Sequence, residues 1–326
     1  MQNFEHASPS TLKEATALLG ASWADAQVLA GGTDLISLMK DYVETPRRVV
    51  NIKNIKELNG ISANKTGVRI GALVTFEELG NHAAIRTQFP SLVTAVRGVT
   101  SPQIRNMGTV AGDLCQRPRC WYYRTGNGLL GIKDGKSLVQ EGENRYHAIF
   151  ASGPAFFVSA SSLGPALVAL GAKVKLVSAT GSREVDAAKF FVAPANETSR
   201  EIALQPNEIV SEILIPVSGV KNATYEVREK DALDWPLATA SVALRMKGSA
   251  IESGQVVLGH VAATPWVASQ ASGMLAGKII DEKVAEQIGQ AAVEGAKPLR
   301  DNGYKVQLAR VAVKRALLEA VGKKAV

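Results

Sequence analysis

The chain has 326 residues, of which 46% are hydrophobic and 21% charged, and its formal net charge is +7. This balance supplies a sizeable apolar core and excludes a largely disordered chain. Two cysteines are too few for a disulfide-stapled secreted scaffold, and the absence of long runs of like charge argues against a nucleic-acid partner.

The N-terminal part predicts a small α/β unit. An amphipathic helix within 8–25 precedes a strand at 27–30, a helix at 34–41 and a strand at 48–52. A short turn of helix at 55–58 follows, so the β-α-β unit closes near residue 56.

A glycine turn joins the strand at 27–30 to the helix at 34–41. Its two adjacent glycines, Gly31 and Gly32, permit positive φ and leave backbone N–H groups bare, and the following helix adds its dipole. A phosphate or pyrophosphate is therefore the predicted occupant of the turn. The alternative is a tight strand-to-helix turn without a ligand.

A second turn of this kind lies in 101–114. Before it, the sequence predicts strands at 61–63 and 68–72, a helix that Thr75 and Glu78 cap, and a helix at 90–96. The segment itself carries Gly108, Thr109, Gly112 and Asp113 among small apolar residues. Small residues let the backbone approach a flat or phosphorylated ligand, and Asp113 can accept from a ribityl or ribose hydroxyl. A bulged strand packed under a helix is the alternative, but two such turns favour one elongated ligand held from both sides.

The remainder of the chain predicts an insertion and a second domain. Residues 115–150 are loop-rich and dense in arginine and aromatic residues, as in an interaction surface or a lid. Beyond them we expect strands at 155–158, 173–178, 182–185 and 209–216 and a helix at 161–170. A boundary at 218–219 divides domain 1–218, with subdomains of about 1–56 and 57–218, from domain 219–326. The second domain predicts an antiparallel sheet of strands 223–228, 240–246 and 254–261, and helices at 268–275, 281–295 and 304–321.

The sequence lacks the common motifs in which side chains carry out catalysis. It contains no phosphate loop of the Walker type, no dinucleotide fingerprint, no nucleophile elbow and no paired-histidine metal motif. Cys115 and Cys120 could supply two ligands to zinc or to an iron–sulfur cluster, but such sites need about four. We therefore expect no metal site.

The segments 30–34 and 105–113 together resemble the paired FAD-binding motifs of the flavoprotein subunits of molybdenum hydroxylases, the xanthine dehydrogenase, carbon monoxide dehydrogenase and aldehyde oxidoreductase family. The resemblance extends over nearly the whole chain, through Ser161-Ser162-Leu163, Glu208-Ile209-Val210, Arg228-Glu229-Lys230 and Gly259-His260-Val261. It implies an α+β fold: a two-part FAD-binding domain of the vanillyl-alcohol-oxidase (PCMH) type, followed by a smaller α+β domain with an antiparallel sheet.

The resemblance also implies roles for particular residues. Ala30 to Asp34 would hold the pyrophosphate, while Thr109, Gly112 and Asp113 would hold the ribityl and phosphate region from the other side. Ile104 and Val210 would pack against the rings, Ser161 and Ser162 would lie near the flavin, and Lys230, with Arg228 as its competitor, would place a positive charge near the pyrimidine. The implied cofactor-binding set is Leu29, Ala30, Gly31, Gly32, Thr33, Asp34, Leu35, Ile104, Gly108, Thr109, Gly112, Asp113, Ser161, Ser162, Val210 and Lys230.

Two departures from the family pattern stand out. Many relatives have an aspartate at the position of Ser162. The branch with a 4Fe-4S cluster in this subunit has several cysteines after the position of Cys120, whereas residues 121–150 contain none. The polar contact at Ser162 is therefore expected to differ, and the cluster is expected to be absent.

The function implied is that of the FAD-binding electron-transfer subunit of a molybdenum hydroxylase or dehydrogenase complex, an oxidoreductase. Its partners would be a molybdopterin-binding large subunit, a 2Fe-2S small subunit, and NAD or another electron acceptor. The flavin carries the chemistry, so no catalytic side chain is expected. Two alternatives remain: a standalone FAD-dependent oxidoreductase and a flavin-free interaction protein. With no membrane span and no signal peptide in the sequence, we expect a cytoplasmic protein, or a periplasmic one if a signal-bearing partner exports it.

Overall fold

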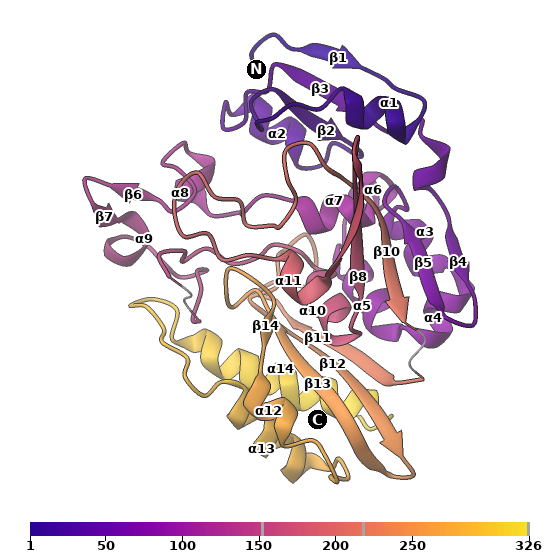
Figure 1. Ribbon diagram of the computed structural model, residues 1–326. Helices are drawn as coiled ribbons and strands as arrows, with labels where there is room; N and C mark the ends of the chain where they lie inside the picture. Colours follow the sequence, from indigo (N-terminus) through magenta and orange to yellow (C-terminus); the bar gives the residue numbers. More distant parts are fainter. Residues whose placement is uncertain (151–152, 217–218, 325–326) are drawn as a thin grey trace.

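The computed structural model describes residues 1–150, 153–216 and 219–324 (Figure 1). The N-terminal part is a parallel sheet of order β1-β3-β2, made of β1 (Glu5–Ala7), β2 (Ala26–Leu29) and β3 (Arg48–Asn51). Helix α1 (Leu12–Ala17) connects β1 to β2, α2 (Leu35–Lys40) connects β2 to β3, and the short η1 (Lys56–Leu58) follows. The predicted β-α-β unit is therefore confirmed.

A five-stranded antiparallel sheet forms the next layer, with the order β4-β5-β10-β8-β9. Its strands are β4 (Ile61–Ala63), β5 (Gly67–Gly71), β8 (Lys173–Ser178), β9 (Gly181–Asp186) and β10 (Ile209–Pro216). The apolar β10 lies in the middle, between β5 and β8, and is buried over most of its length. This sheet therefore joins segments that lie far apart in the sequence.

Short helices pack against this sheet and supply its core. They are α3 (Phe76–Asn81), α4 (Ala83–Gln88), α5 (Pro90–Gly98), α10 (Gly164–Ala169) and α11 (Ala187–Phe190). The capping box at the start of α3 forms as predicted, because Thr75 Oγ1 accepts from the N–H of Glu78 and the Glu78 carboxylate accepts from the N–H of Thr75. The segment 101–114 is not a bulged strand: it folds into α6 (Pro102–Met107) and α7 (Val110–Cys115), separated by Gly108 and Thr109.

The insertion after α7 is loop-rich, as predicted, and extends to the left in Figure 1. It contains α8 (Trp121–Arg124), the two-stranded β6 (Ile132–Lys133) and β7 (Lys136–Ser137), and α9 (Leu138–Glu141). The predicted strand at 155–158 is wrong. Its Phe156 carbonyl accepts from the N–H of Ala148, and the Phe157 ring is buried against the insertion, in a cluster that includes Leu38 and Tyr123.

The C-terminal part is a second antiparallel sheet with helices on one face. Its strands are β11 (Lys221–Val227), β12 (Ala238–Lys247), β13 (Ala250–Gly259) and β14 (Trp266–Val267), in that order. Helices α12 (Ser269–Gly273), α13 (Glu282–Ala292) and α14 (Tyr304–Ala320) pack on this sheet, which confirms the predicted arrangement. On the other side, α5 and α10 contact its strands. The predicted boundary at Ser218 lies outside the described residues.

The described ranges contain no helix that is both long and apolar enough to cross a membrane.

Candidate functional site

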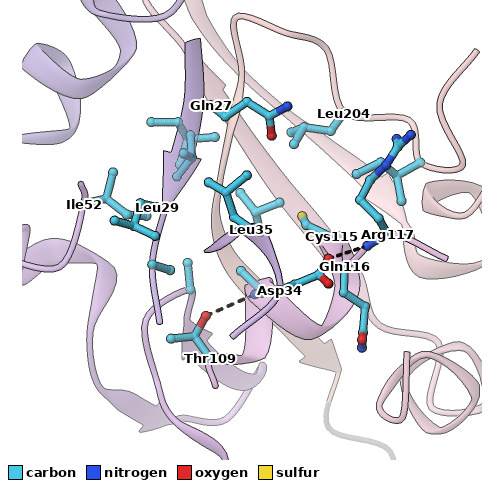
Figure 2. A pocket seen from close by; sticks show the side chains of 18 of the residues that line it. Gln27, Leu29, Asp34, Leu35, Ile52, Thr109, Cys115, Gln116, Arg117 and Leu204 are labelled. Carbon is cyan, nitrogen blue, oxygen red and sulfur yellow. Dashed lines mark hydrogen bonds between the residues drawn. The ribbon is translucent and has the colours of Figure 1, made fainter. Parts of the chain in front are cut away.

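A cleft runs between the N-terminal sheet, α7 and the end of β10 nearest to residue 209 (Figure 2). It encloses about 1010 Å³, counting the space at its open mouth. Its walls are largely apolar and include Leu29, Leu35, Ile52, Leu204 and Val210. A concave site with largely apolar walls and a few polar groups is typical of a small-molecule or cofactor site.

The glycine turn that follows β2 presents bare backbone to this cleft. Gly32 has a φ of 74°, a conformation that glycine adopts without strain. A Cβ at Gly31 would lie 1.8 Å from the carbonyl oxygen of Met107, so no side chain fits there. Across the described part of the chain, the N–H groups of residues 31–34 donate to no protein acceptor. Four successive N–H groups are thus available to an anion, next to the N-terminus of α2.

The second predicted turn lines the same cleft and lies next to the glycine turn, since the Gly108 nitrogen is 3.3 Å from where a Cβ on Gly31 would lie. Thr109 caps α7, because its Oγ1 accepts from the N–H of Gly112 over 3.1 Å. Both residues line the cleft together with Gly31 and Gly32. The structure therefore brings the two turns together, although more than seventy residues of sequence separate Gly32 from Thr109.

Asp34 links the glycine turn to the insertion. One of its carboxylate oxygens accepts from the backbone N–H of Arg117 over 2.8 Å (Figure 2). The other contacts the guanidinium groups of Arg124 and Arg119 at 2.8 and 3.1 Å. A free carboxylate would repel an anionic ligand at this turn, and these cations neutralise it. We call this set of contacts the Asp34 latch.

A second group of charges lies beside the cleft. The Arg117 guanidinium pairs with Glu201 at 2.9 Å and Glu44 at 3.4 Å, and Arg200 pairs with Glu44 at 3.1 Å. Arg200 also lies over the ring of Trp23, with 4.1 Å between the guanidinium carbon and the ring centroid. Arg117, Arg200 and Trp23 line the cleft, yet none of the three was among the predicted site residues. The density of arginine in 115–124 was a signal for Arg117 alone, and it does not identify the partners of that residue.

Asp113 lies behind the cleft wall, where it joins α7 to the start of α10. It is 5% exposed. Its carboxylate accepts from Ser161 Oγ at 2.5 Å and from the N–H groups of Ser162 at 3.1 Å and Leu163 at 3.0 Å. Burial raises the pKa of Asp113 to about 6, although these hydrogen bonds act in the opposite direction. The predicted trio of Asp113, Ser161 and Ser162 is thus brought together, but none of the three lines the cleft.

The other predicted site residues are placed as follows. The Gly108 nitrogen lies 3.3 Å from the position of a Cβ built on Gly31, whereas Ile104 is 43% exposed on α6. Lys230 is exposed, and its competitor Arg228 is largely buried in an ion pair with Glu226. Burial raises the pKa of Glu226 to about 7. Of the predicted set, the residues that line the cleft are Leu29, Ala30, Gly31, Gly32, Thr33, Asp34, Leu35, Thr109, Gly112 and Val210.

Both cysteines are free thiols. Cys115 lines the cleft, and burial raises the pKa of its thiol to about 12, so it stays protonated and unreactive. Within the described ranges, no group of three or more His, Cys, Asp or Glu side chains is placed to hold a metal ion. What the cleft offers is bare N–H groups beside apolar walls, which suits an elongated ligand carrying phosphates and flat rings.

Comparisons with known proteins give a consistent result. Residues 2–218 match the FAD binding domain in molybdopterin dehydrogenase, and residues 223–320 match the CO dehydrogenase flavoprotein C-terminal domain. The chain is 29% identical to the aldehyde oxidoreductase FAD-binding subunit PaoB of Escherichia coli, over 98% of this chain and 99% of that subunit. It is 28% identical to the carbon monoxide dehydrogenase medium chain of Hydrogenophaga pseudoflava, over 96% of both chains. A solved structure of the Hydrogenophaga pseudoflava carbon monoxide dehydrogenase, lacking the Mo-pyranopterin moiety of its molybdenum cofactor, superposes with a TM-score of 0.77 at 27% identity, over 98% of this chain and 97% of that one.

Proposed function

Because the chain belongs to the family of FAD-binding medium subunits of molybdenum hydroxylases, we propose that it passes electrons from the iron–sulfur clusters of a small subunit to NAD or another acceptor. Membership of the family makes it an oxidoreductase subunit whose cofactor is FAD. Its partners in this proposal are a molybdopterin-binding large subunit and a 2Fe-2S small subunit. When bound, FAD supplies the conversion of single electrons into an electron pair.

We assign the cofactor's pyrophosphate to the glycine turn. The four unbonded N–H groups of residues 31–34 support this, because they are the donors that a phosphate oxygen needs. The Asp34 latch supports it as well, since it removes the negative charge that would oppose the ligand.

We assign the ribityl chain and the rings to the part of the cleft that Thr109, Gly112 and Val210 line. Val210 supplies an apolar contact from β10. Asp113, Ser161 and Ser162 act one layer further out, where their hydrogen bonds fix α7 against α10. Their role in this proposal is to hold the wall of the cleft in shape.

The observation that carries the proposal is the convergence of both glycine turns on one cleft. Its first test is to purify the full chain, add FAD and record the visible absorption after removal of unbound cofactor. We expect a yellow protein with one FAD per chain. A chain that stays colourless with FAD, and also in the presence of its co-expressed large and small subunits, would contradict the proposal.

The acceptor and the partners need a separate test. We expect the tagged chain to copurify the large and small subunits and the reduced complex to be reoxidised by NAD⁺ or another two-electron acceptor. A flavin-loaded chain that copurifies neither subunit would instead favour the standalone oxidoreductase.

A further inference from the structure

A second pocket lies between the insertion, the C-terminal sheet and the loop that precedes α10. It encloses about 890 Å³, counting its open mouth, and shares no lining residue with the cleft. We call it the interdomain pocket. Its lining includes Arg119, Tyr146, His147, Trp235, His260 and Lys305.

Aromatic rings form much of this pocket and are incompletely covered. Trp235 is 43% exposed and Tyr146 is 39% exposed, although both are large apolar groups. The Arg119 guanidinium lies over the Trp235 ring, 4.9 Å from its centroid. Trp121 lies edge-on to Tyr146, with 6.0 Å between the ring centroids. Such rings provide flat surfaces on which a planar ligand can stack.

Two buried histidines in the wall of this pocket, His147 and His260, each have one ring nitrogen without a hydrogen-bond partner among the described residues. His260 Nδ1 lies 3.0 Å from the Thr239 hydroxyl, but its Nε2 has no partner among the described residues. His147 Nε2 lies 3.1 Å from Cys120 Sγ, and its Nδ1 is likewise unpartnered within those ranges. A buried polar atom without a partner has lost its hydrogen bonds to water, and a ligand oxygen would restore one. The backbone at His260 also has a φ of 60°, a strained conformation of the kind found at binding sites.

The charges around the pocket favour an uncharged ligand. Burial lowers the pKa of His260 to about 3 and that of His147 to about 4, so both rings are neutral near pH 7. Burial lowers the pKa of Lys305 to about 7, and its Nζ already donates to the carbonyls of His260, His147 and Tyr146 at 2.7, 3.0 and 3.2 Å. Arg119 is engaged by Asp34. An anion would therefore find no free cation here, whereas a neutral carbonyl would find an imidazole N–H.

We propose that the interdomain pocket binds an uncharged planar aromatic compound that carries a carbonyl oxygen, as a quinone does. Its ring stacks on the Trp235 and Tyr146 side of the pocket. Its oxygen accepts from His260 Nε2–H, in the tautomer whose Nδ1 accepts from the Thr239 hydroxyl. This inference rests on the proposed function in one respect: reduced FAD would supply the two electrons and two protons that convert a bound quinone into its quinol.

Binding is tested directly by equilibrium dialysis of 1,4-naphthoquinone against the full chain, with and without FAD. We expect one probe molecule per chain in both forms. His260→Asn should weaken probe binding about tenfold, the loss expected for one hydrogen bond of about 1.4 kcal/mol. Asparagine is chosen because it tolerates positive φ. Trp235→Ala, at a half-exposed position, should weaken binding by a similar factor through lost stacking.

The matched control is His82→Asn, the same change at a histidine outside the pocket whose Nδ1 is also buried and unpartnered among the described residues. It should leave probe affinity unchanged. Failure of the probe to bind, equal affinity in all three variants, or displacement of the probe by NAD⁺ would overturn the inference. Bound FAD is measured separately by its visible absorption, so a failure of the proposed function is recognised independently of the dialysis result.

Discussion

At position 31 the backbone leaves room for glycine alone. A Cβ there would meet the Met107 carbonyl oxygen at 1.8 Å, and this contact can be relieved only by moving α6 away from the turn. We expect Gly31→Ala to weaken FAD binding at least about tenfold, which corresponds to 1.4 kcal/mol. Titration of the FAD-free chain, followed by flavin fluorescence, measures this.

The control for that variant is Gly273→Ala. Gly273 lies exposed in α12, and a Cβ there meets nothing within 4 Å. Its FAD affinity should match that of the wild type. If the two alanine variants bind FAD equally well, the close approach of the turn to Met107 does not matter for binding.

Asp34 provides a second prediction. Asp34→Asn removes the charge that holds Arg119 and Arg124, and leaves these partly buried cations without a counter-charge. We expect a loss of about 1–3 kcal/mol in the free energy of unfolding and faster trypsin cleavage within residues 117–124. Urea unfolding and timed proteolysis measure the two effects.

Asp41→Asn, an exposed change immediately after the same helix, should alter neither quantity. Unchanged proteolysis in Asp34→Asn would mean that the latch does not hold the insertion.

These two residues mark the limit of what the sequence could predict. The glycine turn depends on neighbouring residues, so its conformation was readable from a short segment. The latch was not, because Arg117 and Arg124 lie 83 and 90 residues beyond Asp34. No local pattern distinguishes an arginine that pairs with a distant carboxylate from one that faces solvent.

At the scale of elements, the contact between α7 and the start of α10 predicts a pH dependence. The pKa of Asp113 is about 6 in the folded chain, against 3.8 without burial, so between these pH values the folded state retains a proton that the unfolded chain has released. The stability that this group contributes is therefore present below about pH 4 and lost as the pH rises through 6. A shift of roughly two units corresponds to about 3 kcal/mol.

Asp113→Asn cannot titrate, so its free energy of unfolding should lack this part of the pH dependence. Between about pH 4 and pH 6.5, we expect the free energy of unfolding of the wild type to fall by roughly 3 kcal/mol relative to that of the variant. Urea unfolding at several pH values measures it, and the subtraction cancels the titration of groups that do not interact with Asp113. A difference that stays constant with pH would show that Asp113 is not buried in this way.

Helices and strands could be predicted where the local sequence signals, such as capping residues and hydrophobic periodicity, indicated the same structure. The capping box of Thr75 and Glu78, the apolar β10 and the alternating β8 all formed as expected. The strand predicted at 155–158 was wrong. Phe156-Phe157-Val158 has high strand propensity, but Phe157 is buried against a distant part of the insertion and the segment does not pair as a strand. Residues 101–114 contain two six-residue helices, α6 and α7, separated by Gly108 and Thr109. Helices this short do not show a recognisable hydrophobic periodicity in the sequence.

For the whole molecule, the position of the cleft predicts that FAD stabilises the fold. The cleft is built from the N-terminal sheet, α7 and β10, so a bound cofactor contacts all three. We expect FAD at one hundred times its dissociation constant to raise the free energy of unfolding by about 2.7 kcal/mol. Urea unfolding at increasing FAD concentration should shift the midpoint accordingly. A midpoint that does not move would mean that FAD binds the unfolded chain as well, or not at all.

The central place of β10 has a consequence for biosynthesis. Its residues, 209–216, are translated long after those of β5, the neighbour with which it pairs. A nascent chain on the ribosome therefore lacks both the middle of its main sheet and the Val210 wall until about two thirds of the protein has been made. Cofactor capture is consequently a late event in the synthesis of this protein, and early translation intermediates must persist without it.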